Sequence, residues 1–167
     1  MKKALAIAGI LALSITPTAS FADHLEPKEG EIRPGGNLAH ANLRFRTLRD
    51  RNLSGLNLSG LDLSFARLSG ADLRNSNLRG AILSNANLFR ADLRNSNLRG
   101  SILTDADLFG ANMGFTNLRG ANLFRADLRG AILDNANLGG INATNLKACP
   151  SSLPSGWVCE NNSLIQR

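Results

Sequence analysis

The chain has 167 residues, of which 29 are Leu, 19 Asn and 16 Gly, while it contains one Val, one Trp and no Tyr. This skew excludes an ordinary mixed globular core and suggests that one local structural solution is repeated along the chain. The formal net charge of +6 excludes a strongly acidic surface.

Residues 1–22 contain the three regions of a secretory signal peptide in order. Lys2 and Lys3 are positively charged, residues 4–15 are uncharged and apolar, and the segment ends in Ser20-Phe21-Ala22, with small residues where cleavage requires them. The apolar stretch is too short to span a bilayer. We therefore expect export to an oxidising compartment, with no stable membrane insertion of the mature chain. The mature net charge would be 17 − 13, or +4.

Residues 23–35 (DHLEPKEGEIRPG) are charged and contain two prolines. Such a composition disfavours regular structure, so we interpret this segment as a flexible leader ahead of the next domain. His24 lies in the leader and His40 just after it. Each His is isolated in the sequence, and we expect it to be exposed and not catalytic.

Between positions 38 and 138 the same residue type returns every five residues. Of 21 consecutive positions, 20 hold Leu and the other holds Met113. The residue two before each Leu is usually small: the 15 positions from Ala66 to Ala136 hold 11 Ala, three Ser and Thr116. The residue between the two is usually Asn or Asp. Residues 36–140 are therefore predicted to form one repeat domain.

A period of five excludes both standard elements. On an α-helix, successive Leu would rotate by about 140° and face every side. On a flat strand, an odd step would move each Leu to the opposite face. A short extended piece followed by a bend keeps both columns inside, and the Gly or Asn two residues after most Leu suits the bend. The chain is therefore predicted to coil about an axis, with successive coils paired about 4.8 Å apart.

Self-similarity favours four five-residue units per coil. Residues 71–80 recur identically at 91–100, a shift of 20, and Asn also recurs at this spacing from Asn37 to Asn137. Residues 86–94, however, recur at 121–129, a shift of 35. The number of units per coil therefore stays open at this point.

The Ala-Asp/Asn-Leu-x-x units between Asn37 and Gly140 resemble the pentapeptide-repeat family. This resemblance implies an all-β fold, a right-handed quadrilateral parallel β-helix solenoid of about five coils, with the Leu and the small residue facing inward. A signal peptide together with a C-terminal pair of cysteines further resembles the exported, lumenal branch of the family in cyanobacteria and chloroplasts. This resemblance implies that the protein resides in the thylakoid lumen or the periplasm.

Departures from the repeat mark its ends. Arg46 and Arg51 stand in the small-residue column, where burial of an unpaired Arg would be costly, so we expect a distorted first coil. Residues 141–167 are predicted to form a short cap, for which a helix is one option. Cys149 and Cys159 are predicted to form a disulfide within it. A metal site would need further Cys or His ligands nearby, and a redox motif would need fewer residues between the two cysteines.

No catalytic residue, metal site or cofactor is predicted. Leu and small side chains would fill the axis, and no phosphate loop, calcium repeat or zinc spacing is present in the sequence. We interpret the protein as a noncatalytic structural or protein-interaction module and not an enzyme. One alternative is a DNA mimic that binds topoisomerases, as in cytoplasmic members of the family, which export and basic charge disfavour. The other is a ligand binder or enzyme that uses the cap.

The functional surface would then be the outside of a solid rod. An apolar set is a candidate patch for an unidentified protein partner: Ile82, Ile102, Phe89, Phe109 and Phe124. A basic set would form ladders for an anionic partner: Arg74, Arg79, Arg94, Arg99 and Arg119. Both sets also have structural interpretations, because apolar ladders stabilise sheets and Asp72 and Asp92 would balance charge. Nucleic acid is not expected as a partner, and the expected state is a monomer or weak homodimer.

Overall fold

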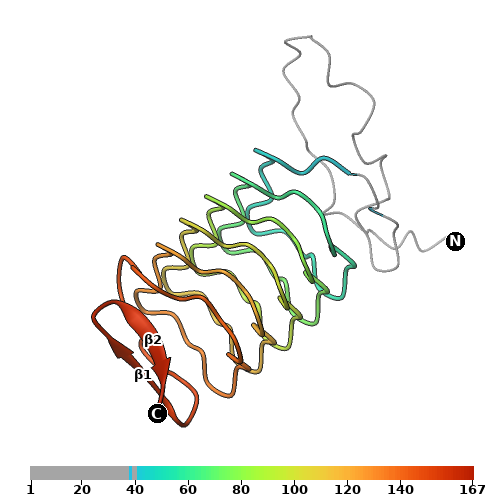
Figure 1. The fold of residues 1–167 in the computed structure, drawn as a ribbon. Coiled ribbons are helices and arrows are strands. Elements are labelled where there is room, and N and C mark those ends of the chain that lie inside the picture. Colours follow the sequence, from blue (N-terminus) through green and yellow to red (C-terminus); the bar gives the residue numbers. More distant parts are fainter. Residues whose placement is uncertain (1–37, 39–40) are drawn as a thin grey trace, which may run out of the picture.

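The described residues form a rod of stacked coils that ends in a small hairpin, as the computed structural model shows (Figure 1). The structure describes Leu38 and residues 41–167. The predicted signal peptide (1–22) and leader (23–35) lie outside the described residues.

Each coil of the repeat contains 20 residues, because parallel β-bridges join residues 20 apart. Past the repeat, Asp127 bridges Ala148, which is 21 residues later. One bridge lies on each of four faces, which we name after the bridging residue of one coil: the Asp72, Asn77, Ile82 and Asn87 faces. Asn77, for example, bridges Asn97, and Ile82 bridges Ile102. This register decides between the two shifts seen in the sequence, in favour of four units per coil.

The corners between faces are four-residue β-turns with one backbone geometry. The N–H of Ala71 donates to the carbonyl of Leu68 at 3.0 Å, and equivalent bonds recur along the rod. The third residue of the turn has a positive φ, such as 58° at Asn75 and 66° at Gly80, which is the pattern of a type II turn. Most corners therefore hold Gly or Asn, the residues that adopt this conformation at least cost.

The side chain of the Asn or Asp before each Leu accepts a hydrogen bond from the backbone of the following corner. The sequence pattern did not indicate this role. Oδ1 of Asn97 accepts a hydrogen bond from the backbone N–H of Arg99 at 3.1 Å. Oδ1 of Asp72 accepts the equivalent bond from Arg74, also at 3.1 Å. Amide and carboxylate oxygens serve equally as acceptors here, so the backbone tolerates either residue.

The Leu column and the small residues fill the axis. Leu73, Leu93 and Met113 are fully buried on one face, and the same holds for most of the repeat. The polar members of the small-residue column have partners: Oγ of Ser76 donates to the Leu73 carbonyl at 2.7 Å, and Oγ1 of Thr116 to that of Leu93 at 2.8 Å. These bonds remove the penalty for burying a hydroxyl.

The first coil is more regular than predicted. The N–H of Arg67 donates to the carbonyl of Arg46 at 2.8 Å, and the N–H of Asp72 to that of Arg51 at 2.9 Å. Both Arg46 and Arg51 are half-buried, not enclosed. The predicted distortion is therefore wrong for this part of the coil, because the backbone keeps its pairing while the long side chains stay partly in solvent.

The cap is a β-hairpin, which corrects the helical option. Strands β1 (Trp157–Glu160) and β2 (Ser163–Gln166) pair antiparallel. Asn161 and Asn162 join them with φ values of 47° and 55°, the pattern of a type I′ turn. The N–H of Leu164 on β2 donates to the carbonyl of Ala143 at 3.0 Å, so the hairpin lies over the last coil.

The predicted disulfide between Cys149 and Cys159 is present, with Cα atoms 5.9 Å apart. It links the segment that leaves the last coil to β1. Leu153, Trp157 and Cys159 pack against the buried core, so the bond holds an apolar cover in place. No cysteine among the described residues is free.

Candidate binding surfaces

The apolar candidates are distributed over two faces of the rod. Ile82 and Ile102 are bridge partners on the Ile82 face, and Ile102 is 39% exposed. Phe124 follows on the same face in the next coil, at a corner position, and is half-buried. Phe89 and Phe109 lie on the Asn87 face instead. The five residues therefore form an Ile pair with a neighbouring Phe, and a separate Phe pair.

The Phe89 and Phe109 rings stack on each other with centroids 5.4 Å apart and planes 14° from parallel. Each ring also has a guanidinium over it: Arg90 lies 5.0 Å from the Phe89 centroid and Arg129 lies 5.3 Å from that of Phe109. Both rings are half-buried. Aromatic stacking and cation–π contacts stabilise neighbouring coils, while both rings keep part of their surface exposed.

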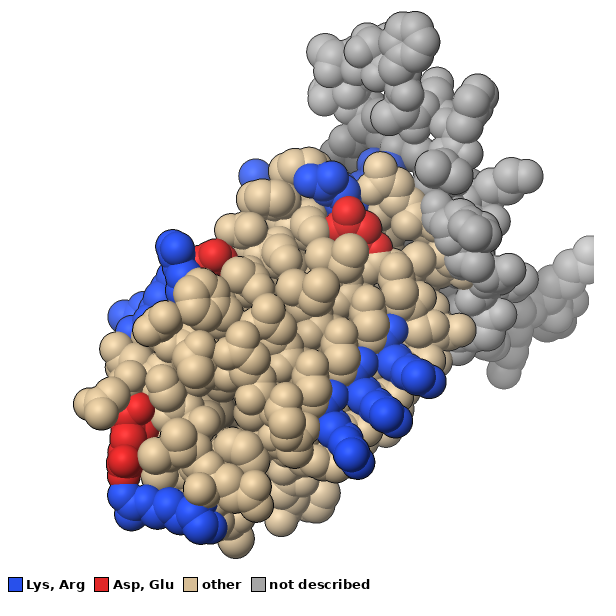
Figure 2. Space-filling view, in the orientation of Figure 1, with Lys and Arg blue, Asp and Glu red and all other residues tan. Residues whose placement is uncertain are grey.

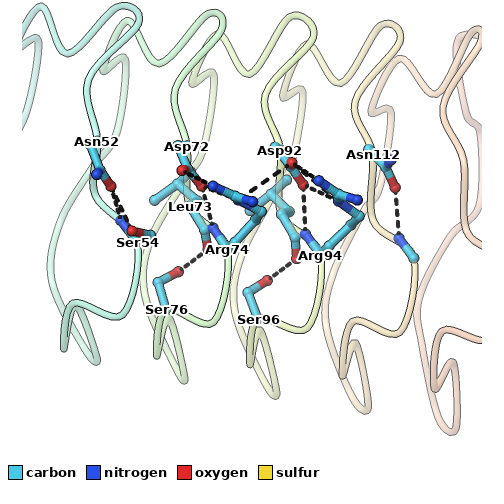
Figure 3. Close-up of polar contacts among 12 residues, drawn as sticks. Asn52, Ser54, Asp72, Leu73, Arg74, Ser76, Asp92, Arg94, Ser96 and Asn112 are labelled. Atoms are coloured by element: carbon cyan, nitrogen blue, oxygen red, sulfur yellow. Dashed lines mark hydrogen bonds and ion pairs between the residues drawn. The ribbon is translucent and has the colours of Figure 1, made fainter.

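The basic candidates separate into two kinds, and the first kind is paired with carboxylates (Figure 3). Nε and Nη2 of Arg74 donate to the two carboxylate oxygens of Asp72 at 2.8 and 2.6 Å, and Nε lies 3.7 Å from Asp92 in the next coil. Arg94 binds Asp92 in the same way, with Nη2 at 2.7 Å. Charges on the Asp72 face therefore alternate and largely neutralise one another.

These pairs change the acidity of the carboxyl groups. The side-chain hydrogen bond from Arg74 lowers the pKa of Asp72 below its ordinary value of 3.8. Burial alone would raise the pKa of Asp92, but the hydrogen bonds and charge of Arg94 outweigh burial and lower it. The pKa of Asp127 is lowered in the same way by Arg129. All three groups are therefore charged at neutral pH.

The second kind, Arg79, Arg99 and Arg119, lies in one column at the edge of the Asn77 face. All three side chains are exposed. Their backbone N–H groups donate to the Asn side chains two residues earlier, at 3.1 to 3.2 Å. Across the described chain, none of the three guanidinium groups has an ion-pair partner. Figure 2 shows a row of basic side chains along the rod with no acidic side chain in it.

The structure also reveals exposed aromatic residues that the sequence analysis missed. Phe45 and Phe65 stack with centroids 5.0 Å apart and are 64% and 42% exposed, and Phe115 on another corner is 63% exposed. All three occupy the positive-φ position that Gly and Asn normally hold. The available signal was their place in the register, two residues after a Leu, where an aromatic residue breaks the pattern.

Two further features bear on the chemistry of the surface. No cluster of three or more His, Cys, Asp or Glu side chains suited to a metal ion exists among the residues that the structure describes. Within that same part of the chain, no helix has the length and apolar character needed to cross a membrane.

Comparison with known families agrees with the coil geometry. The family described as pentapeptide repeats matches in eight copies over residues 37–75, 48–85, 66–105, 86–123, 101–140 and 121–147. These segments cover most of the chain. The chain belongs to the pentapeptide-repeat family. Members of this family fold as right-handed β-helices, which agrees with the predicted fold class.

Several solved structures of pentapeptide repeat proteins resemble the chain. One from the cyanobacterium Cyanothece 51142 is 40% identical over 56% of this chain and 64% of its own, with a TM-score of 0.54. One from the thylakoid lumen of Arabidopsis thaliana is 32% identical over 61% and 71%, with a TM-score of 0.35. One from Nostoc is 34% identical over 60% and 83%, with a TM-score of 0.33.

The chain thus spans less than two thirds of the Cyanothece protein's length. A search of curated protein sequences finds no match. The family match therefore establishes the family and its fold, while the function must be argued from the surface of this rod.

Proposed function

We propose that this pentapeptide repeat protein is a noncatalytic module that binds a protein partner through the outer faces of its rod. The observation that carries the proposal is the filled axis: Leu and small side chains occupy the interior coil after coil. Side chains able to recognise another molecule lie outside, where they form regular columns. A column of identical groups at constant spacing suits an extended protein surface better than a small molecule.

The apolar columns are the first candidates for contact. Ile102 and the stacked Phe89 and Phe109 rings expose apolar area on neighbouring faces of consecutive coils. Aromatic side chains are enriched in protein interfaces, and surrounding apolar contacts contribute by excluding water from them.

The disulfide supports the proposed site of action. A bond between Cys149 and Cys159 persists in an oxidising compartment and is rare in a reducing cytosol. Together with the predicted signal peptide, it supports export to the thylakoid lumen or the periplasm. N-terminal sequencing of the protein from its host would test export: the expected first residue is Asp23, and an intact Met1 would contradict it.

Capture of partners tests the proposed function. Tagged protein comprising residues 23–167 would be incubated with extract of the exported compartment, and bound proteins would be identified by mass spectrometry. We expect a specific protein to be captured by the wild type and lost when Ile82, Ile102, Phe89 and Phe109 are all replaced by Thr.

Ile132→Thr is the matched control. The exposed fraction of Ile132 is 37%, similar to the 39% of Ile102, but Ile132 lies on the Asp72 face. Circular dichroism would verify that every variant keeps its coils. Capture of nothing by the wild type would contradict the proposed function. Unchanged capture by the fourfold variant would show that the partner binds elsewhere on the rod.

A further inference from the structure

The Asn77 face differs from the other faces in carrying no acidic residue. The residue before the repeat Leu is Asn in each of its five described units, which are residues 56–60, 76–80, 96–100, 116–120 and 136–140. The amide side chains form a ladder, in which Nδ2 of Asn77 donates to Oδ1 of Asn57 at 3.0 Å. Arg79, Arg99 and Arg119 emerge beside this ladder, one per coil. Their positive charge therefore meets only neutral neighbours on this face.

On the Asp72 face, by contrast, carboxylates neutralise the corresponding column of Arg residues. There, the residue two before Arg74 and Arg94 is Asp, and each Asp holds its Arg in an ion pair. Asn77 and Asn97 occupy the same position in the unit and make the same backbone bond to Arg79 and Arg99. Because the corner accepts either residue, its geometry does not require the Asn. Asp would serve the corner equally and would cancel the charge.

The corner next to this Arg column holds no side chain. Each described coil has Gly there, at positions 60, 80, 100, 120 and 140, whereas the other three corners include Asn, Phe, Arg or Asp. A Cβ atom added at Gly80, Gly100 or Gly120 would meet nothing within 4 Å. Bare backbone therefore separates the Arg column from the next face, and another molecule can approach it closely.

Beyond the bare corner lies the Ile pair. Ile82 and Ile102 follow three residues after Arg79 and Arg99 and bridge each other on the Ile82 face. Two acidic residues flank the Ile pair on that face, and both are already paired. Asp62, the bridge partner of Ile82, lies 3.6 Å from Arg44, and Asp105 lies 3.0 Å from Arg125. A basic column, a flat glycine corner and an apolar pair thus run side by side along the rod. We call this surface the Arg–Ile strip: Arg79, Arg99, Arg119, Ile82 and Ile102.

We propose that the Arg–Ile strip binds an amphipathic α-helix that carries an acidic stripe beside an apolar stripe and lies along the rod axis. This inference rests on the proposed protein-binding function and specifies the chemistry of the partner. Carboxylates of the helix meet the unpaired guanidinium groups, and its apolar stripe covers the Ile pair. Charge complementarity and the neighbouring apolar area both select this occupant.

The spacing of the coils favours a helix over an extended segment. Successive Arg residues are separated by the coil spacing of about 4.8 Å. Side chains on one stripe of an α-helix repeat about every 5.4 Å, the helical pitch, whereas those on one face of an extended strand repeat about every 6.7 Å. Over two coils, the side-chain positions of the helix depart from the Arg positions by about 1.2 Å, and those of the strand by about 3.8 Å. Long Arg side chains absorb the first difference more readily than the second.

A synthetic peptide tests the inference with the mature protein, residues 23–167. The probe is a helix-forming peptide of about 20 residues with Glu in one stripe and Leu in the adjoining stripe, long enough to be helical in water. Binding would be measured by fluorescence anisotropy. Two control peptides carry Gln in place of Glu, or the Glu and Leu stripes on opposite sides. We expect the probe to bind, and both controls to bind at least tenfold more weakly.

Variants of the protein locate the site. The triple variant R79Q/R99Q/R119Q should weaken binding about tenfold, since three surface ion pairs are lost. The triple variant N77D/N97D/N117D should do the same with every Arg retained, because each new Asp would pair with the Arg two residues later. The control R74Q/R94Q/R129Q removes the same total charge from residues that are already paired, and should leave affinity within twofold of the wild type. I82T/I102T should also weaken binding.

The outcomes separate this inference from the proposed function. Equal weakening by R79Q/R99Q/R119Q and R74Q/R94Q/R129Q would mean that net charge alone attracts the peptide, and would overturn the inference. Tighter binding of phosphatidylglycerol vesicles or polyphosphate than of the peptide, unaffected by I82T/I102T, would overturn it in favour of those anions. If the wild type captures a protein from extract that R79Q/R99Q/R119Q captures equally, the inference fails while the proposed function stands.

Discussion

Among the residues that the structure describes, seven corner residues hold a positive φ although they are neither Gly nor Asn: Phe45, Asp50, Phe65, Arg90, Asp105, Phe115 and Arg125. The left-handed region costs an ordinary residue about 1–2 kcal/mol, because Cβ crowds the backbone. The coil imposes this conformation on them, since pairing above and below fixes each corner. Phe115 is the clearest case, because its ring is exposed and recovers little free energy by burial.

Replacement of Phe115 by Asn should therefore stabilise the protein. Asn75, Asn95 and Asn135 occupy the same corner in other coils, so the substitution introduces the residue that this corner usually holds. We expect a gain of about 1 kcal/mol, measured by urea denaturation. Phe65→Asn is the comparison, and its gain should be smaller because Phe65 stacks on Phe45. A lower denaturation midpoint for Phe115→Asn would show that the ring contributes packing that outweighs the backbone strain.

At the scale of the element, a face of the rod is a ladder in which each column repeats one interaction. On the Asp72 face the repeated unit is an Asp that closes a corner and also binds an Arg, as at Asp72 and Asp92. Stacked like charges would destabilise such a ladder. The contact between Arg74 and Asp92 in the next coil shows how alternation of sign turns stacking into attraction.

The acid stability of the rod should depend on these pairs. The pKa values of Asp72, Asp92 and Asp127 are below 3.8 in the folded protein, so the unfolded chain takes up protons first as the pH falls. Their contribution is complete above about pH 4 and is lost as the pH drops through the folded-state values. We expect a lower Tm at pH 2.5 than at pH 6.

The triple variant D72N/D92N/D127N keeps an acceptor for each corner but removes the ion pairs. Its Tm should be lower than that of the wild type at pH 6, and the difference should shrink as the pH falls through the folded-state pKa values of these carboxyl groups. The difference between wild type and variant should also shrink in high salt. A difference in Tm that stays constant with pH would show that the substitutions act through the corners and not through charge.

The C-terminal hairpin is an element stabilised from two directions. Backbone bonds join it to the last coil through Leu164 and Asn162, and the disulfide joins β1 to Cys149. Because the bridged cysteines are 10 residues apart, the closed loop is short. In the chain-entropy account, such a loop stabilises the folded state by about 2–3 kcal/mol.

Loss of the disulfide should therefore loosen the hairpin before the coils. In C149S/C159S we expect faster hydrogen exchange at the amides of Leu146 and Leu164, whose bonds join the hairpin and the last coil. Amides in the central coils, such as that of Leu93, should change little, because each coil contacts only its neighbours. Equal acceleration in both regions would show that the hairpin and the rod unfold as one unit.

At the scale of the whole molecule, much of the fold was predictable because one short rule governs it. The Leu column, the small-residue column and the bends at Gly or Asn followed from the period of five and from backbone sterics. The number of units per coil did not, because shifts of 20 and 35 both occur and pairing between coils decided between them. The hairpin was missed because its strands are only four residues long and lie outside the repeat.

The candidate surfaces were predictable only as columns. Sequence spacing placed Arg74 and Arg79 in neighbouring columns but could not show that one is paired and the other is not. That difference depends on whether the acceptor at the corner is Asp72 or Asn77, and the corner role of these residues appears only in the hydrogen bonds. Phe45 and Phe65 were missed because their stacking depends on a corner conformation that composition does not reveal.

A rod of paired coils has an open edge wherever its pairing stops, and the hairpin covers one such edge. The carbonyl of Ala143 and the N–H of Leu146 are paired with Leu164 and Asn162. Without the hairpin these groups, and the apolar side chains beneath Trp157, would face solvent. Exposed strand edges act as templates for pairing with another chain. The hairpin should therefore keep rods from associating end to end.

Deletion of residues 156–167, with Cys149→Ser to avoid a free thiol, should convert the mature protein into larger species as its concentration rises. Light scattering coupled to size exclusion would measure the mass, and circular dichroism would verify that the coils persist. Full-length C149S/C159S is the matched control: it lacks the disulfide but keeps the hairpin, so its mass should equal that of the wild type. If the shortened rod keeps the mass of the full-length state at every concentration, the hairpin serves stability alone, and another feature of the rod prevents stacking.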